Sequence, residues 1–173
     1  MPELFQNQYR IKSARLEGYD YTQPAWYFIT ICTKDHKEYF GKIVDNEIVL
    51  NKTGSIALKC WKEIPAHFPN TDIDSHILMP NHIHGIVIIN YRRDAACCVS
   101  TPATGSLSAI VRSYKSAVSN IVRKNINPHF QWQTRFYDRI IRNEKELYRI
   151  RKYIEQNPLK WELEKNNPGN IIT

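Results

Sequence analysis

The chain has 173 residues, enough for one domain with its own core, and 24 Lys and Arg against 17 Asp and Glu give it a net charge of +7. This charge favours a polyanionic partner. Residues 1–18 are polar and basic and no apolar run approaches about 18 residues, so we expect neither a secretory signal nor a membrane span. The four cysteines show no C-x-x-C spacing, which indicates reduced thiols and a cytoplasmic protein without a cysteine zinc site.

Apolar periodicity divides the chain into interleaved strands and helices. Wholly apolar or alternating runs predict strands, and apolar residues spaced by three and four predict helices. The expected strands are Trp26–Thr33, two short strands within Phe40–Leu50 around a turn at Asp45-Asn46, Asp72–Met79, His82–Asn90 and Phe136–Ile141. The expected helices are Thr53–Phe68, Leu107–Lys124 and one that begins after Asn143 and ends at Pro158.

This order of elements predicts a single domain with an antiparallel sheet. A basic N-terminal arm at residues 1–20 precedes a core at residues 21–161, and a C-terminal tail at residues 162–173 follows it. We expect an α+β fold of the ferredoxin-like or RNA-recognition type, with the helices packed on one face of the sheet. The other face would then be free to present functional side chains.

Two histidines, His82 and His84, open the strand that follows the turn at Pro80-Asn81. Side chains alternate along a strand, so both imidazoles point to one side while Ile83 points into the core. Two imidazoles about 7 Å apart on a rigid strand can share one metal ion. A solvated strand face is the alternative interpretation of a His-x-His pattern alone.

The last predicted helix carries Tyr153 and Asn157 four residues apart, with Arg149 in the same row beside the apolar stripe. A phenol has a pKa of ~10 and becomes a useful nucleophile only when a cation or base stabilises its anion. This face suits a tyrosine that attacks phosphate, with the Asn157 carbonyl as a third metal ligand. Tyr114 is the rival nucleophile, but it lies on the apolar stripe of its helix, which predicts a core residue. A structural role for Tyr153 and Asn157 near a helix end also stays open.

Three stretches in the same order resemble the single-tyrosine HUH transposases of the insertion-sequence-200 type. They are Met79–Gly85, Trp132–Asn143 and Tyr153–Trp161. The chain is most similar to the REP-associated tyrosine transposases of bacteria, and the likeness runs from about Arg15 to Trp161. The resemblance implies a ferredoxin-like core, a metal held by His82, His84 and Asn157, and Tyr153 as the nucleophile.

The resemblance further implies a DNA strand-transferase that acts on single-stranded or hairpin-forming DNA. Tyr153 would attack the scissile phosphate in line, form a 5′-phosphotyrosine and leave a free 3′-OH. The metal would act as a Lewis acid, and mixed nitrogen and oxygen ligands favour Mg²⁺ or Mn²⁺. The candidate contacts to the DNA backbone are Arg112, Lys115, Arg123, Arg149 and Lys152.

Two other functions remain open on the sequence. In a metal-dependent hydrolytic nuclease, water would attack the phosphate and no covalent adduct would form. In a non-catalytic nucleic-acid-binding module, aromatic side chains of the sheet would stack on bases. The sequence also leaves monomer and homodimer open, because related transposases include dimers that complete each active site with the partner's tyrosine helix.

Overall fold

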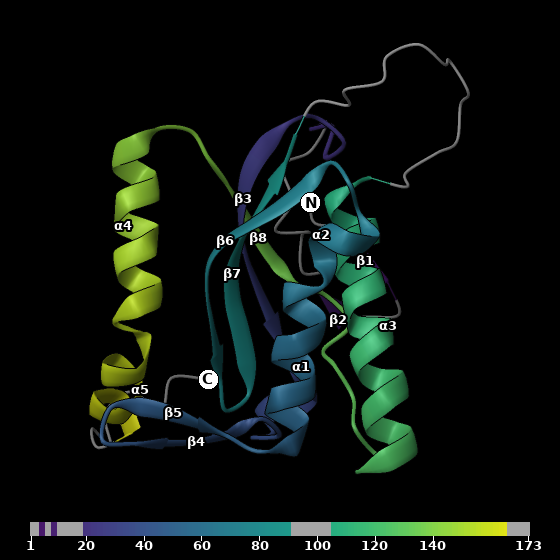
Figure 1. Cartoon of the computed structure of the whole chain (residues 1–173), viewed down its shortest axis with the longest axis vertical. Coiled ribbons are helices and arrows are strands. Elements are labelled where there is room, and N and C mark those ends of the chain that lie inside the picture. The colour runs from purple at the N-terminus through teal and green to yellow at the C-terminus, as the bar shows by residue number, and fades with distance from the viewer. Residues whose placement is uncertain (1–3, 6–7, 10–18, 91–104, 166–173) are drawn as a thin grey trace.

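A four-stranded antiparallel sheet forms the centre of the computed structural model (Figure 1). The structure describes residues 4–5, 8–9, 19–90 and 105–165. The strands of the sheet lie in the order β6-β7-β3-β8. Their bounds are β3 Ala25–Cys32, β6 Thr71–Met79, β7 His82–Ile89 and β8 Tyr137–Ile141. β3 and β7 have neighbours on both sides, which suits their apolar, β-branched and aromatic sequences.

Two helices, α1 (Lys52–Lys62) and α3 (Leu107–Asn125), cover one face of this sheet (Figure 1). Their apolar stripes bury against the inward-facing side chains of β3 and β7 in the main hydrophobic core. The buried inward-facing side chains of these two strands are Tyr27, Ile29, Ile31, Ile83, Val87 and Ile89. The predicted α+β fold, an antiparallel sheet with helices packed on one face, is therefore confirmed, but the other face is not left free as expected, because α4 packs on part of it.

The helix α4 (Glu144–Glu155) lies along the opposite face of the sheet (Figure 1). Ile150 and Ile154 of α4 pack with Ile86 of β7 in a second, smaller apolar cluster. The predicted cap is present, because the Asn143 side chain accepts a hydrogen bond from the Glu146 amide at 2.9 Å. Hydrophobic side chains on one stripe of α4 thus fix this helix over the sheet face that carries the histidines.

Two local predictions differ in their outcome. The hairpin is confirmed as β4 (Gly41–Val44) and β5 (Glu47–Leu50), and Asp45 and Asn46 have φ of 51° and 61°, as a type I′ turn requires. The predicted helix Thr53–Phe68 is instead divided into α1 and α2 (Ile64–His67), separated by Glu63. Pro65 has no N–H to donate, so the first helix cannot continue through it.

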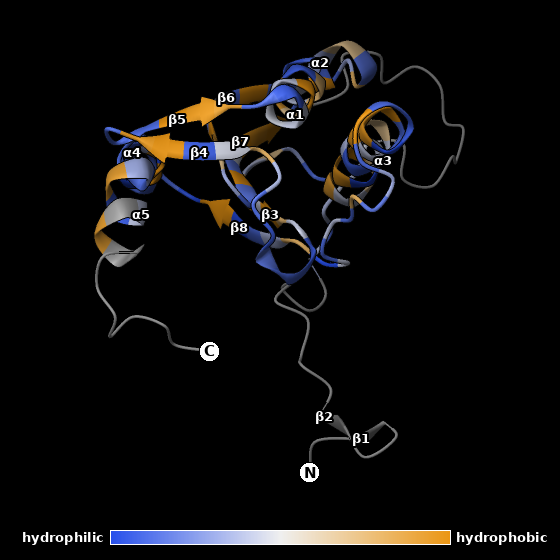
Figure 2. Ribbon diagram, turned by 90° about the horizontal axis from the view of Figure 1, so that it is seen from below, coloured by the Kyte–Doolittle hydropathy of each residue, from blue (hydrophilic) through white to orange (hydrophobic). Residues whose placement is uncertain are grey.

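The helical chain continues beyond Pro158 as α5 (Asn157–Lys165), where an end had been expected. A proline is compatible with the first turn of a helix, where its missing N–H is not needed. Figure 2 shows the hydrophobic strands β4 and β5 reaching towards α5, with which both are in contact. None of the helices within the described ranges is long and apolar enough to cross a membrane.

Several predicted segments fall outside the described residues. They are residues 91–104 of the predicted core, the part of the tail beyond Lys165 and most of the arm at residues 1–20. Of the arm, the structure describes residues 19–20 and the short strands β1 (Leu4–Phe5) and β2 (Gln8–Tyr9), which pair with each other. Of the four cysteines, the structure describes Cys32 and Cys60, and both are free thiols.

Candidate active site

The two histidines lie at the start of β7, on the sheet face covered by α4. β7 pairs with β3 so that His82 is opposite Cys32 and His84 is opposite Thr30. Ile83 between them is fully buried in the main core, so the predicted alternation along the strand is confirmed. Gly85 follows because a Cβ at that position would overlap the Trp61 ring of α1, which packs directly on β7.

The imidazoles of His82 and His84 converge on one point, with their Nε2 atoms 3.0 Å apart. The outer nitrogens are held by neighbouring side chains: His82 Nδ1 lies 2.6 Å from Asn81 Oδ1, and His84 Nδ1 lies 2.8 Å from Thr30 Oγ1. Such partners fix the orientation of a ring whose other nitrogen is a ligand. The arrangement is that of two donors aimed at a common centre.

The hydrogen bonds determine which ring nitrogen carries the proton. Asn81 Nδ2 donates to the His36 carbonyl at 3.1 Å, so Asn81 Oδ1 is the acceptor that faces His82. His82 Nδ1 therefore carries the proton and its Nε2 has a lone pair. The proton between the two rings then belongs to His84 Nε2, and His84 Nδ1 accepts from the Thr30 hydroxyl.

Both histidines are held neutral at ordinary pH. Burial lowers the pKa of His82 to about 3, with the neighbouring His84 and His36 adding to the effect. Burial also lowers the pKa of His84 to about 4. A neutral imidazole is the form that can bind a cation, because its second nitrogen keeps a lone pair. Desolvation therefore keeps both imidazoles neutral, the form that metal ligation would require.

Tyr153 of α4 lies directly beside His84. The centroids of the two rings are 5.3 Å apart, and Phe28 of β3 contacts both rings. The ammonium group of Lys160 lies 4.8 Å from the centroid of the Tyr153 ring. Tyr153 is 38% exposed, whereas its rival Tyr114 is 3% exposed and belongs to the main core, as predicted. Of these two tyrosines, only Tyr153 can be reached by a large substrate.

Asn157 lies between two residues that contact the histidine pair. Tyr153, Asn157 and Trp161 are spaced by four, and the Gln156 and Lys160 amides donate to the Lys152 and Gln156 carbonyls on the two sides of the junction of α4 and α5. Tyr153 contacts His84, and the Trp161 ring lies 5.7 Å from His82 by ring centroids. Asn157 is buried at 6% exposure. The role of its amide as a metal ligand stays a prediction from the sequence motif.

The structure does not bring the five predicted DNA-binding residues together. Arg149 and Lys152 are exposed on α4, the helix of Tyr153. Arg112, Lys115 and Arg123 are on α3, which packs on the other face of the sheet. The charges on α4 are consequently the ones adjacent to the candidate nucleophile.

Two of the three predicted DNA contacts on α3 bind the protein itself. The Lys115 ammonium donates to the carbonyl of Gln133 at 2.7 Å and contacts the next two carbonyls, and burial lowers the pKa of Lys115 to about 8. Arg123 Nε donates to the Phe130 carbonyl at 2.7 Å. These contacts anchor the segment that connects α3 to β8.

The sequence analysis did not identify four residues that complete the site: Thr30, Phe28, Lys160 and Trp161. Lys160 and Trp161 belong to the stretch that resembles the nucleophile helix of the family, so this motif could have indicated them as site residues. Thr30 and Phe28 lie in a strand whose register against β7 cannot be read from the sequence.

Within the described ranges, no three His, Cys, Asp or Glu side chains come together to hold a metal ion. The donors to consider are thus the two imidazoles and the Asn157 amide.

Comparisons with known proteins agree with this description. No protein-family model matches the chain. A Haemophilus influenzae protein, itself described as uncharacterized, is 37% identical over 161 residues, which cover 87% of this chain and 89% of that protein. The solved structure of a REP-associated tyrosine transposase bound to a REP hairpin matches with a TM-score of 0.58 and 18% identity, over 85% of this chain and 74% of that one. This match confirms, at the level of the fold, the resemblance that the sequence motifs indicated.

Proposed function

Because the chain belongs to one family with the Haemophilus influenzae protein and has the fold of the REP-associated tyrosine transposase, we propose that it is a transposase-like DNA strand-transferase. It would cleave and rejoin single-stranded or hairpin-flanking DNA, with Tyr153 as the nucleophile. The observation that carries this proposal is the contact of the Tyr153 ring with His84, whose Nε2 converges with that of His82.

The donor set suits an octahedral cation. Two neighbouring ligands of an octahedral ion with bonds of ~2.1 Å lie about 3 Å apart, and the two Nε2 atoms are 3.0 Å apart. His82, His84 and the carbonyl oxygen of Asn157 would hold Mg²⁺ or Mn²⁺, and Mn²⁺ accepts imidazole more readily. Bound there, the cation would supply Lewis-acid stabilisation of charge on a phosphoryl oxygen.

Ligation through both Nε2 atoms requires one change of tautomer. His84 must carry its proton on Nδ1 rather than on Nε2. The Thr30 hydroxyl lies 2.8 Å from His84 Nδ1. It can accept a hydrogen bond from a protonated Nδ1 or donate one to an unprotonated Nδ1. Thr30 therefore supports both tautomers, whereas Asn81 already holds His82 in the ligand form.

The chemical step would be a transesterification, in which one bond to phosphorus forms as another breaks. Tyr153 Oη would form a bond to phosphorus as the bond to the 3′ oxygen breaks. The phenol would lose one proton and the departing 3′ oxygen would gain one. The product would be a 5′-phosphotyrosine, which a second 3′-OH can attack to rejoin DNA without a nucleotide cofactor. Lys160, over the Tyr153 ring, is placed to attract the phosphate.

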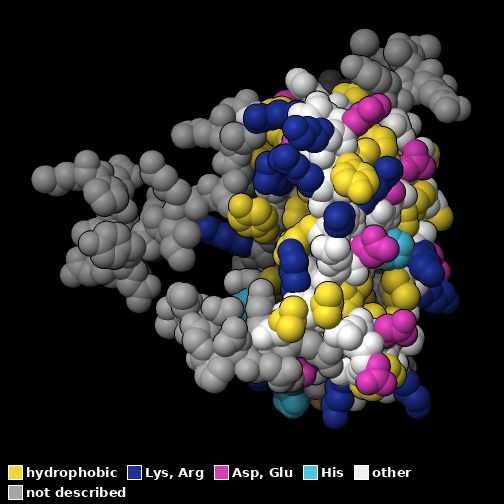
Figure 3. Space-filling view, turned by 90° about the vertical axis from the view of Figure 1, so that its left-hand side faces the viewer, with side chains coloured by type: hydrophobic (Ala, Val, Ile, Leu, Met, Phe, Trp, Pro, Cys, Tyr) yellow, Lys and Arg dark blue, Asp and Glu magenta, His cyan; other side chains and the backbone are white. Residues whose placement is uncertain are grey.

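The surface around α4 suits a nucleic-acid partner. Figure 3 faces α4 and shows Lys and Arg side chains most densely over its upper part. Exposed basic residues on α4 include Lys145, Arg149, Arg151 and Lys152. Cations of this kind bind phosphates without regard to sequence. Arg149 and Lys152 are therefore our principal proposed DNA contacts, and Arg112, Lys115 and Arg123 stay as predicted contacts for DNA that extends around α3.

The proposal is tested by incubating the protein with end-labelled single-stranded DNA and Mn²⁺ and separating the products on a denaturing protein gel. We expect a labelled band that migrates with the protein and disappears with a chelator. His82→Ala and His84→Ala should abolish it, and Asn157→Ala should reduce it. His67→Ala removes an exposed imidazole on α2 and should leave the band unchanged.

The two alternative functions give different results in the same assay. A hydrolytic nuclease would cut the DNA in a metal-dependent reaction without a labelled protein band. A binding module would retain the DNA under native conditions without cutting it. A metal-independent adduct would contradict the proposed roles of His82, His84 and Asn157.

A further inference from the structure

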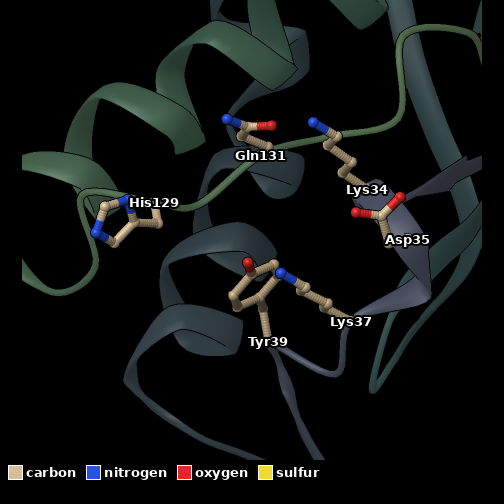
Figure 4. A pocket seen from close by; sticks show the side chains of 6 residues that line it. All are labelled: Lys34, Asp35, Lys37, Tyr39, His129 and Gln131. Atoms are coloured by element: carbon tan, nitrogen blue, oxygen red, sulfur yellow. The ribbon is translucent and has the colours of Figure 1, made fainter.

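A pocket of about 300 Å³ lies beyond the end of β3 (Figure 4). Two chain segments form it: the residues that follow β3 and the residues between α3 and β8. The side chains that line it are Lys34, Asp35, Lys37, Tyr39, His129 and Gln131. Figure 4 shows them arranged around a common space, with His129 and Gln131 from one segment and the other four from the other.

The backbone holds these two segments firmly together. The Lys34 amide donates to the Gln131 carbonyl at 3.0 Å, and the Gln133 amide donates to the Cys32 carbonyl at 2.9 Å. The Tyr39 ring packs edge-on against the fully buried Phe130, with ring centroids 5.1 Å apart. The wall of the pocket is therefore fixed by the fold, as in most small-molecule sites.

The pocket segment is also connected to the histidine that begins β7. Thr33 and His36 both bind Asn81: the Thr33 amide donates to the Asn81 carbonyl at 2.9 Å, and Asn81 Nδ2 donates to the His36 carbonyl. Asn81 in turn orients His82. Lys34 follows Cys32 by two residues and Cys32 pairs with His82, so the backbones of Lys34 and His82 lie on the order of 10 Å apart.

The backbone between the two lysines is strained. Asp35 and His36 both have positive φ, 55° and 52°, a region that residues other than glycine seldom occupy. Such conformations persist where the surroundings enforce them, and they are frequent at binding sites. Lys34, Asp35 and Lys37 line the pocket from this one short segment (Figure 4).

The chemistry of the lining fits a nucleotide. Lys34 and Lys37 supply two ammonium groups, which outnumber the one carboxylate of Asp35 and can bind a phosphate. Tyr39 offers an aromatic ring of the kind on which bases stack. The Gln131 amide both donates and accepts hydrogen bonds, as the edge of a base requires.

We propose that this pocket binds one nucleotide of the single-stranded DNA that flanks the scissile phosphate. This inference rests on the proposed function and adds a specificity subsite to it. If the scissile phosphate of a DNA strand lies at the histidine pair, one of the next few nucleotides of that DNA strand would lie in the pocket. The nucleotide's phosphate would lie between Lys34 and Lys37, and its base would contact Tyr39 and Gln131. Because Asn81 binds both the pocket segment and His82, a nucleotide in the pocket would affect the orientation of the His82 ring.

The test measures binding separately from cleavage. Fluorescein-labelled single-stranded hexanucleotides are titrated against the full chain with a chelator present, and anisotropy is recorded. We expect Lys34→Ala/Lys37→Ala to weaken binding roughly tenfold relative to Lys42→Ala/Lys62→Ala, a control that removes the same charge from exposed sites elsewhere. Gln131→Ala, at an exposed position, should reduce the difference in affinity between hexamers that differ in one base.

Tyr39 provides a second, independent variant. Tyr39→Ala should weaken binding by roughly five- to 100-fold, whereas Tyr39→Phe, which keeps the stacking ring, should bind like the parent. Since Tyr39 packs on Phe130, thermal unfolding of each variant shows whether the fold survives. Gln131→Ala keeps the test valid if Tyr39→Ala does not fold.

The adduct assay distinguishes the failure of this inference from the failure of the proposed function. If the parent forms the adduct but the pocket variants bind like their controls, the subsite is refuted and the strand-transferase proposal stands. If the pocket variants lose affinity while the parent forms no adduct, the pocket is a nucleotide site and the proposed function is refuted. Unaltered affinity together with no adduct would overturn both.

Discussion

In the proposed metal site, the Thr30 hydroxyl would allow His84 to change its tautomer. It lies 2.8 Å from His84 Nδ1 and can either donate or accept. We predict that Thr30→Val weakens Mn²⁺ binding by about 10- to 100-fold, the usual loss when the partner of a metal-binding histidine is removed. Thr30→Ser, which keeps the hydroxyl, should restore most of the affinity. Calorimetric titration of both variants with Mn²⁺ measures this, and parent-like binding by Thr30→Val would refute the role of Thr30.

The lowered pKa values of His82 and His84 predict a loss of stability in mild acid. In the unfolded chain both side chains bind a proton as the pH falls through about 6.5, while in the folded protein the pKa is about 3 for His82 and about 4 for His84. Between these limits the unfolded chain binds more protons, so the free energy of unfolding falls as the pH is lowered. We expect a loss of about 1 kcal/mol or more per histidine between pH 7 and 5 in metal-free protein.

Urea unfolding at the two pH values measures this loss. The double variant His82→Gln/His84→Gln has no imidazole in the pair, so its stability should change less between pH 7 and 5. Carboxylates titrate mainly below this range and contribute little to the comparison. Equal stability of the parent protein at both pH values would show that the pair is not buried as the structure describes.

At the scale of elements, the position of α4 over the sheet decides whether Tyr153 meets the histidines. Its apolar stripe packs on β7, and Arg151 adds an ion pair to Asp74 of β6, with both Nε and Nη2 within 2.9 Å of Asp74 Oδ2. The Arg151 side chain is 46% exposed, so the pair contributes at most about 1 kcal/mol to stability. Its larger effect would be on alignment, since Arg151 is two residues from Tyr153.

We predict that Arg151→Ala slows adduct formation severalfold while it lowers the free energy of unfolding by less than about 1 kcal/mol. Lys59→Ala is the matched control, because it breaks the exposed Lys59–Glu63 pair on α1, away from the site. Rates of adduct formation and urea unfolding curves are measured for both variants. A proportional loss of rate and stability, or the same rate loss in the control, would indicate that the ion pair does not align α4.

At the scale of the whole molecule, a single tyrosine beside the sheet must reach an exposed phosphate. The net charge of +7 is modest, so we do not expect attraction to the phosphates to separate the two strands of a duplex. We predict that a single strand or a hairpin flank is cleaved at least about tenfold faster than the same sequence in a perfect duplex, and that binding weakens as salt rises. Equal cleavage of duplex and single strand would contradict this substrate preference.

Local sequence signals predicted most elements of the fold. The Asp45-Asn46 turn, the Asn143 cap and the alternation at Ile83 each depend on neighbouring residues, and each is confirmed. Two errors came from prolines. Pro65 divides a helix that periodicity alone makes continuous, and Pro158 lies in the first turn of α5, where the end of a helix was predicted. A proline is compatible with the first turn of a helix and also with the residues just beyond the end of a helix. Whether a proline marks the start or the end of a helix therefore depends on the neighbouring residues.

Long-range contacts of the site were not predictable to the same extent. The pairing of Thr30 with His84 depends on the register between β3 and β7, and the Asp74–Arg151 pair joins residues far apart in the chain. Lys115 is a further example: its charge predicts a DNA contact, which stays a prediction, and the structure adds that its ammonium group binds three carbonyls of the chain. A basic side chain on a helix face gives no indication in the sequence of which partner it will bind.

The central claim is that Tyr153 is the residue that becomes covalently joined to DNA. The most direct test is to isolate the protein–DNA product formed with Mn²⁺, digest both components and identify the modified residue by mass spectrometry. Tyr153→Phe and Tyr114→Phe are the paired variants. Tyr114 Oη has no hydrogen-bond partner within the described residues, so its removal should leave stability unchanged or slightly higher. The account predicts a nucleotide on Tyr153, no adduct from Tyr153→Phe and a normal adduct from Tyr114→Phe; a nucleotide on Tyr114, or an adduct from Tyr153→Phe, would contradict it.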